Sequence, residues 1–149
     1  MVRRVSDGVW LVTGVQASGK STVADLLARQ FERAVHVRGG QFYNIYGPDV
    51  IGWLRSVSAR PRHLVVLRPS VSVVWQREHQ RHEAIGKTAY RPGEFTVEEL
   101  DGFLAQTPQI GLWLDTSAQT AIQTVAEIMR RRAEALVDEA LARSGQVAT

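Results

Sequence analysis

One stretch near the amino end has the residue types and spacing needed to hold a chain of phosphates. It matches the pattern G-x-x-x-x-G-K-[ST] in full. The stretch consists of Gly14, Val15, Gln16, Ala17, Ser18, Gly19, Lys20, Ser21 and Thr22. Glycines let such a loop wrap closely around phosphate oxygens, so that backbone N–H groups and the positive end of the next helix face the anion. The pattern therefore predicts a nucleotide-binding loop.

Two side chains of this loop have distinct tasks when a nucleotide binds. Lys20 would bridge the β- and γ-phosphates, and the Ser21 hydroxyl would take one position on Mg²⁺. The only lysines in the chain are Lys20 and Lys87, so a lysine at the required position is a specific signal. The alternative is a glycine- and serine-rich turn that merely links a strand to a helix. No Asn-Lys-x-Asp motif for reading guanine is present, which favours ATP over GTP.

An acidic residue at the end of a neighbouring strand commonly supports the Mg²⁺ shell in such enzymes. Asp115 follows an apolar run and fits that pattern, but it also fits the cap of a turn with Thr116 and Ser117. Asp49 could serve the metal or cap the helix that starts there. We favour the cap interpretation for both residues, which leaves the magnesium acid unassigned.

Cations that could close over a bound nucleotide are easier to find. Arg77 and Arg81 stand one helical turn apart, and Lys87 lies in the glycine-containing loop just beyond. A loop that brings such cations to the phosphates excludes water during phosphoryl transfer. The alternative is a solvated helix face, in which the two arginines lie near Glu78 and Glu83.

Two other clusters are not assigned a function. His79 and His82 lack an obvious third metal ligand, which makes a solvated surface the better interpretation. The basic run 130–132 lies in an expected helix without interleaved aromatic residues, so the sequence does not favour a nucleic acid partner.

The surrounding sequence alternates strands with helices. We expect strands at 9–13, 35–37, 63–67 and 110–114. We expect helices at 20–33, 49–60, from a Ser70 cap to 83, at 97–106 behind a Thr96–Glu99 capping box, and at 120–143. The alternation predicts an α/β fold with a parallel sheet of about four strands covered on both faces.

Composition sets the class of protein. With 149 residues and 44% hydrophobic residues, the chain fits one domain spanning 1–149. It contains no cysteine, which excludes disulfides and thiolate metal sites and fits the cytoplasm. Its apolar runs are far shorter than the roughly 20 residues that span a bilayer, so we expect no membrane partner. The net charge of +3 is too small to indicate a polyanion.

The loop 14–22, the segment 35–42, the cationic loop and the segment 111–117 together resemble bacterial P-loop small-molecule kinases. The group that they resemble is the chloramphenicol phosphotransferase-like proteins, also described as AAA-family predicted ATPases, over about 10–137. This resemblance implies a nucleoside-monophosphate-kinase-like three-layer sandwich, with ATP and Mg²⁺ as cofactors. It also implies transfer of a phosphoryl group to the hydroxyl of a small-molecule acceptor.

Two departures from that family bear on catalysis. Gly40 stands where relatives tend to have an aspartate that can act as base, and glycine cannot accept the proton. Only Tyr43 separates Phe42 from Asn44, where relatives have a helix and a further strand. We expect the segment 35–37 to pair directly with 9–13, or a second copy of the chain to cover the exposed edge. A nucleotide-binding module without transfer chemistry, acting through assembly or a partner, is therefore the alternative function.

Overall fold

The computed structural model describes residues 8–37, 45–85 and 93–144 and has an α/β architecture. Three parallel strands form one sheet in the order β1-β2-β3. They are β1 (Val9–Thr13), β2 (Arg62–Leu67) and β3 (Leu112–Leu114). The helices of the described part are α1 (Lys20–Ala28), α2 (Asp49–Ser56), α3 (Val71–Ile85), α4 (Val97–Ala105), α5 (Ala121–Arg130), the 3-10 helix η2 (Arg132–Ala135) and α6 (Asp138–Ser144).

The central strand β2 sets the orientation of the sheet. All six of its residues are buried, because helices cover both of its faces. It pairs with β1 from Val9↔Arg62 to Thr13↔Val66, and with β3 from Val65↔Leu112 to Leu67↔Leu114. Since all pairs are parallel, the segments that follow the three strands emerge at one edge, called here the carboxyl edge.

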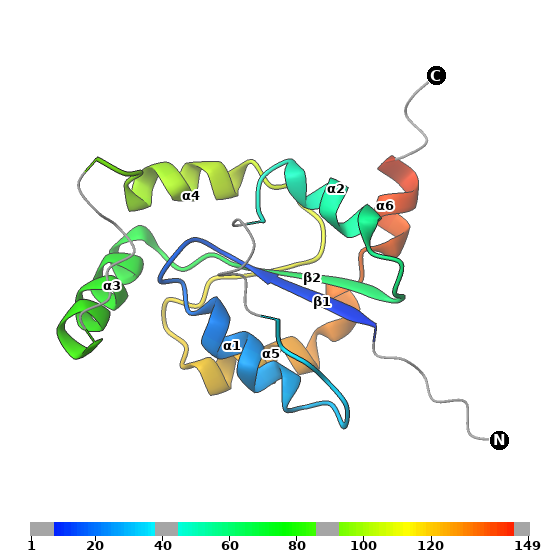
Figure 1. Cartoon of the computed structure of the whole chain (residues 1–149), viewed down its shortest axis with the longest axis horizontal. Coiled ribbons are helices and arrows are strands. Elements are labelled where there is room, and N and C mark those ends of the chain that lie inside the picture. Colours follow the sequence, from blue (N-terminus) through cyan, green and yellow to red (C-terminus); the bar gives the residue numbers. More distant parts are fainter. Residues whose placement is uncertain (1–7, 38–44, 86–92, 145–149) are drawn as a thin grey trace.

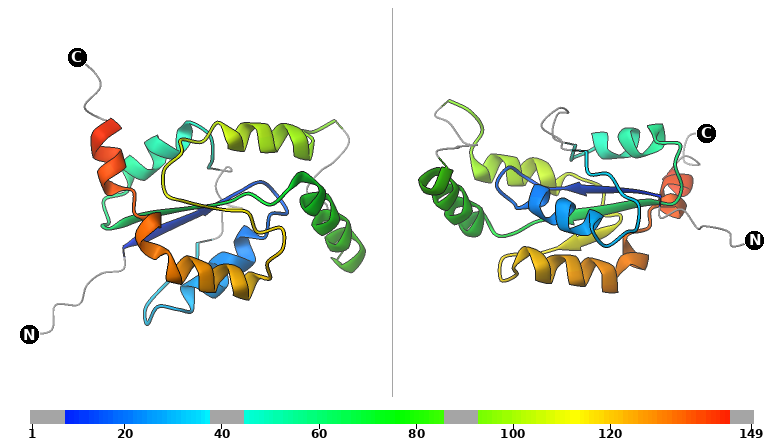
Figure 2. Two further views of the ribbon diagram at one scale, coloured as in Figure 1. Left: turned by 180° about the vertical axis from the view of Figure 1, so that it is seen from behind. Right: turned by 60° about the horizontal axis from the view of Figure 1, so that its bottom comes forward.

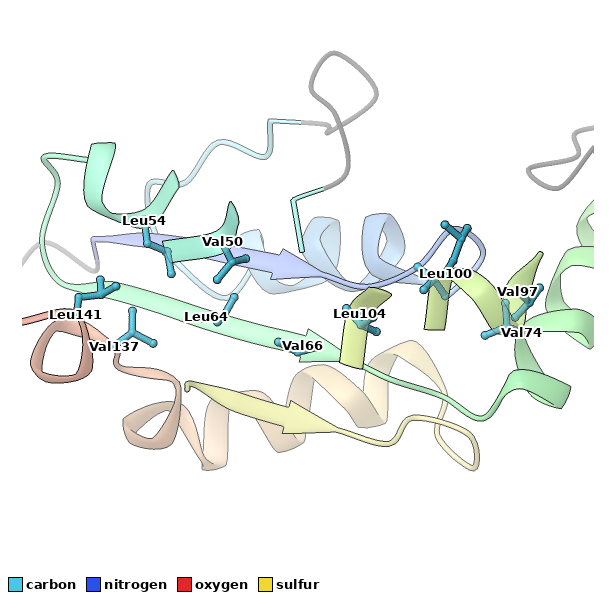
Figure 3. Packing of buried hydrophobic residues seen from close by; sticks show 11 residues of the cluster. Val50, Leu54, Leu64, Val66, Val74, Val97, Leu100, Leu104, Val137 and Leu141 are labelled. Carbon is cyan, nitrogen blue, oxygen red and sulfur yellow. The ribbon is translucent and has the colours of Figure 1, made fainter. Parts of the chain in front are cut away.

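Helices lie on both sides of the sheet (Figures 1 and 2), and a hydrophobic cluster fills the space on each side. The first lies between the sheet and α2, α4 and α6 (Figure 3), and includes Val50, Leu54, Leu64, Val66, Leu100, Leu104, Val137 and Leu141. The second lies between the sheet and α1 and α5, and includes Val23, Leu27, Val65, Leu67, Leu112, Val125 and Ile128. Alternate residues of β2 enter opposite clusters, as the pleat requires. The sequence-based prediction of an α/β fold with a parallel sheet is thus confirmed.

The expected strand at 35–37 is wrong. These residues form no strand, and Val35 and Val37 are 87% and 63% exposed. Between them, His36 Nδ1 lies 2.5 Å from Asp25 Oδ1, so a polar contact with α1 holds this segment. The described sheet therefore has three strands instead of about four, and β1 has one paired neighbour within it. The alternative that a second copy covers β1 stays a prediction.

The long helix expected at 120–143 is also wrong as a single element. It is divided into α5, η2 and α6. At the break, the Val137 N–H donates to the Arg62 carbonyl at 3.0 Å, and Leu136 forms an antiparallel bridge with His63. The reason is tertiary: Val125 belongs to one cluster and Leu141 to the other, so the chain must pass around the amino end of β2.

Helix starts follow the sequence more closely than helix ends. The Thr96–Glu99 capping box is present, with Glu99 N–H donating to Thr96 Oγ1 at 3.2 Å. Ser70 Oγ accepts from the Val73 N–H at 3.4 Å, as expected of its cap position. The helices expected at 20–33 and 49–60 end earlier, at 28 and 56. Among the described residues, no helix combines the length and hydropathy of a membrane span.

Candidate functional site

The loop between β1 and α1 has a backbone that depends on glycine. A β-carbon added to Gly14 would lie 2.6 Å from Ser18 Oγ and 2.7 Å from the Leu67 carbonyl oxygen, so no larger residue fits. Gly19 has φ +91° and Ala17 has φ +62°, and both lie in the left-handed region. Ala17 holds this conformation despite its β-carbon, which costs roughly 1–2 kcal/mol. The loop is thus a tight turn held against the end of β2.

The amino end of α1 faces into this loop. Its N-cap is Gly19, no side chain caps it, and its first turn carries no acidic residue. The first N–H groups of a helix have no partner within the helix and attract anions. Ser18 Oγ, in a residue only 1% exposed, has no hydrogen-bond partner among the described residues. The loop therefore offers donors without acceptors, which fits a phosphate chain.

Lys20 adds a positive charge in an environment that disfavours it. Its Nζ donates to the Val15 carbonyl at 3.3 Å. Burial, and secondarily the positive charge of Arg81, lower the pKa of Lys20 to about 8. No carboxylate within the described part of the chain offsets these two effects. An anion bound beside Lys20 would relieve them.

The two arginines of α3 both act on the loop, although in different ways. Arg77 donates through one Nη to the Ser18 carbonyl and through the other to the Thr116 carbonyl, both at 2.9 Å. Burial lowers the pKa of Arg77, and the nearby Asp115 partly offsets that effect. Arg81 is exposed and close enough to act on Lys20. Arg77 of α3 thus contacts the loop directly. Glu83 of the same helix instead pairs with His79 at 3.2 Å.

The structure does not identify an acid for Mg²⁺. Asp115 accepts hydrogen bonds from the Ser117 hydroxyl at 2.5 Å and the Ser117 N–H at 3.0 Å, and these bonds lower the pKa of its carboxyl. It therefore caps a turn, as favoured from the sequence. Asp49 is the first residue of α2, and the N-cap residue is Pro48. The prediction that Asp49 caps this helix is therefore wrong.

The remaining predicted site residues differ in what can be said of them. Ser21 and Thr22 lie in the first turn of α1 and are exposed. Lys87 and the departure at Gly40 fall outside the described residues. Among the residues that are described, no three His, Cys, Asp or Glu side chains form a group that could hold a metal. The assignment of Ser21 to Mg²⁺ therefore stays a prediction.

An ion pair at the carboxyl edge was not predicted from the sequence. Arg68, directly after β2, donates through Nε to Asp101 Oδ1 at 3.1 Å and through Nη2 to Asp101 Oδ2 at 3.2 Å. The strand beside the loop strand thus ends in a cation, and the acid comes from α4. A buried strand followed by arginine was visible in the sequence, but its partner lies 33 residues further along the chain.

Comparison with known proteins does not assign the chain to a family, since no family model and no curated protein matches it. An uncapped helix end, a glycine-dependent loop and the cations Lys20 and Arg81 converge at one edge of a parallel sheet. This is the edge at which open α/β sheets bind their ligands.

Proposed function

We propose that the chain binds ATP with Mg²⁺ through residues 14–22 and transfers the γ-phosphoryl group to the hydroxyl of a small molecule. One observation carries the proposal: Lys20 lies at an uncapped helix end, donates to the Val15 carbonyl and forms no ion pair with a described carboxylate. The positive charge of Arg81 acts on it as well. A partly buried cation that also feels a second positive charge raises the free energy of the folded chain, unless an anion binds beside it. A triphosphate supplies that anion.

The residues support each part of this reaction. The loop N–H groups would hold the phosphates, and Lys20 would stabilise the charge that develops on the leaving β-phosphate. The acceptor oxygen bonds to the γ-phosphorus as the bond to the β,γ-bridging oxygen breaks, and the hydroxyl proton passes to water or a base. Ser21 would hold Mg²⁺, which neutralises phosphate charge. Arg81 and Lys87 are proposed as the cations that close over the γ-phosphate.

Calorimetric titration with Mg·ATP and Mg·GTP tests the binding step. Wild-type protein should bind Mg·ATP, and Lys20→Ala should weaken that binding by about 100-fold, because charge-assisted contacts to phosphate are lost. Arg29→Ala, at the exposed far end of α1, is the matched control and should bind as wild type does. If neither nucleotide binds to the wild-type protein, the proposal is wrong.

A second candidate is a nucleotide-binding module without transfer chemistry. It is favoured by the carboxyl end of β2, where Arg68 pairs with Asp101 and no acid faces the loop from that strand. ATP labelled in the γ-phosphate, incubated with a panel of small hydroxyl compounds, separates the two candidates. Label transfer that Arg81→Gln slows supports the kinase. Tight binding with no transfer to any acceptor or to water supports the module.

A further inference from the structure

Arg77 connects three segments that follow the three strands. Its helix, α3, follows β2 and extends beyond the carboxyl edge (Figure 1). Its guanidinium donates to Ser18 in the loop after β1 and to Thr116 in the turn after β3. A second link holds the start of α3 to the same turn, since the Ser70 N–H donates to Ser117 Oγ at 2.8 Å. Loop, helix and turn are therefore joined at one point.

The bond to Ser18 fixes the direction of one peptide group. In a planar trans peptide the C=O and the next N–H point in opposite directions. When the Ser18 carbonyl is turned toward Arg77, the Gly19 N–H is turned away from it, to the other side of the loop. Gly19 is the N-cap of α1, so this N–H is one of the donors at the helix end.

We propose that Arg77 is a positioning residue, which holds the loop in its anion-binding conformation through Ser18 and Thr116 and does not itself touch the γ-phosphate. The inference rests on the proposed function. Both of its Nη groups already donate to backbone carbonyls, and such charge-assisted bonds are stronger than bonds between neutral groups. Arg81, exposed one turn further along α3, is the cation of this pair that is free to reach a phosphate.

Nucleotides that differ by one phosphate separate the two roles. A residue that holds the loop affects every phosphate that the loop binds, whereas a residue at the γ-phosphate affects ATP alone. Arg77→Gln should therefore weaken Mg·ADP and Mg·ATP by the same factor, about tenfold. Arg77→Lys, which can keep one of the two bonds, should recover part of the affinity for both. Arg81→Gln should weaken Mg·ATP and leave Mg·ADP nearly unchanged.

Calorimetric titration of these variants with both nucleotides gives the decision, with Gln80→Ala on the same helix as control. A loss confined to ATP in Arg77→Gln would place Arg77 at the γ-phosphate and overturn the inference. Unchanged affinity for both nucleotides would overturn it as well. A melting curve checks that each variant is folded. If Arg77→Gln does not fold, Arg77→Lys takes its place in the test.

Hydrogen exchange in the absence of nucleotide keeps this inference separable from the proposed function. Arg77→Gln should speed amide exchange at 15–19 and at 116–119 together, with β2 unchanged, because the Arg77 guanidinium donates to both of those segments. Unchanged exchange at both segments would contradict the inference even if ATP binds. If the wild-type protein binds no nucleotide, the proposed function fails, and this exchange pattern still decides whether Arg77 holds the loop.

Discussion

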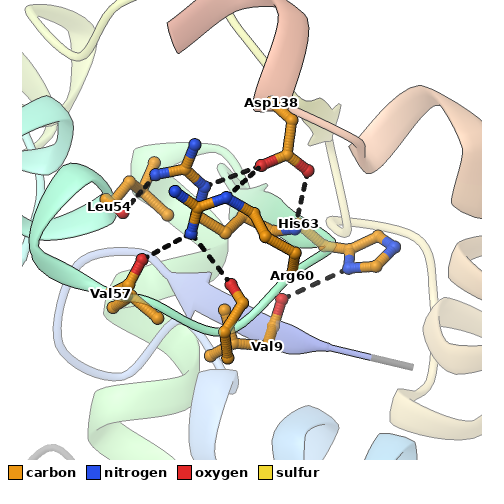
Figure 4. Close-up of polar contacts among 8 residues, drawn as sticks. Val9, Leu54, Val57, Arg60, His63 and Asp138 are labelled. Atoms are coloured by element: carbon orange, nitrogen blue, oxygen red, sulfur yellow. Dashed lines mark hydrogen bonds and ion pairs between the residues drawn. The ribbon is translucent and has the colours of Figure 1, made fainter. Parts of the chain in front are cut away.

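The two ends of β2 differ in what neutralises the buried positive charges: a carboxylate does so at the amino end, whereas Lys20 and Arg77 at the carboxyl end bond only to carbonyls in the described residues. At the amino end, where Asp138 lies beside Arg60 (Figure 4), Arg62 is 7% exposed and donates to acceptors on α6 and α2. Its Nε donates to Asp138 Oδ1 at 2.7 Å, its backbone N–H donates to Asp138 Oδ2 at 2.9 Å, and one Nη donates to the Leu54 carbonyl at 2.9 Å. Arg60 adds a second contact to the same carboxylate at 3.5 Å. The buried Arg62 charge therefore has its counter-charge within the chain.

At the carboxyl end, Arg68 pairs with Asp101, but Lys20 and Arg77 form no ion pair with a carboxylate of the described residues. Arg77 donates to two carbonyls, and Lys20 to one. Carbonyl groups satisfy the hydrogen bonds but carry no net charge, so burial is offset only in part. We therefore expect the ion pair at the amino end to contribute to the stability of the fold. At the carboxyl end, the buried charge of Lys20 should lower the free energy of unfolding, and a bound anion would raise it again.

The largest effect on stability is expected at the amino end. Asp138→Ala leaves the buried Arg62 guanidinium without its counter-charge and should lower the free energy of unfolding by about 3 kcal/mol, because an unpaired buried charge is costly. Urea unfolding at neutral pH measures the change.

The neighbouring residue Glu139 provides the control for this substitution. It pairs with Arg143 at 3.4 Å, but both side chains are highly exposed, so Glu139→Ala should leave stability nearly unchanged. Equal effects of Asp138→Ala and Glu139→Ala would contradict the contrast between the two ends of β2.

A substitution at the carboxyl end should act in the opposite direction. Lys20→Met keeps a similar side-chain length, removes the charge and should raise the free energy of unfolding by about 2 kcal/mol at pH near 7 in the absence of nucleotide. The same variant should lose Mg·ATP binding. Urea unfolding and calorimetric titration of one preparation measure both effects, and a gain in stability with a loss of binding would tie the two together.

The pH dependence of this gain follows from the pKa. Lys20 has a pKa of about 8 in the folded protein and an ordinary value of 10.5. The unfolded chain therefore binds more protons between these values, and wild-type stability should rise relative to Lys20→Met as pH increases from about 8 to above 10. A gain that is the same near pH 7 and near pH 10 would mean that burial of charge is not its cause.

The fold was predictable where local sequence decides the structure. The apolar run of β2, the Thr96–Glu99 capping box and the loop glycines each depend on a few neighbouring residues. The errors lie where distant contacts decide. Val35 and Val37 have strand-forming side chains, but a contact between His36 and α1 determines their placement. Helical periodicity continues through 136–137, yet pairing with β2 breaks the helix there.

The candidate site follows the same rule. Spacing alone predicts the loop and its lysine, because their chemistry depends on adjacent residues. The partners of Arg77 were not, since Ser18 and Thr116 lie 59 and 39 residues away in sequence. Helical spacing placed Arg77 and Arg81 on one side of α3. It did not show that one guanidinium is held by backbone carbonyls while the other stays exposed.

The smallest expected effect is the response of the amino end to acid. Burial alone would raise the pKa of Asp138, but hydrogen bonds from the Arg62 N–H and guanidinium, and the charges of Arg62 and Arg60, lower it below its ordinary value. The stability that ionised Asp138 contributes is complete above an ordinary aspartate pKa of about 4 and is lost as pH falls through the lower pKa of the folded state.

The stability difference between wild type and Asp138→Asn, measured in urea from about pH 6 to about pH 3, should therefore shrink toward acid. If it is constant over that range, the carboxylate charge contributes nothing, and the amino end differs from the carboxyl end in its hydrogen bonds only.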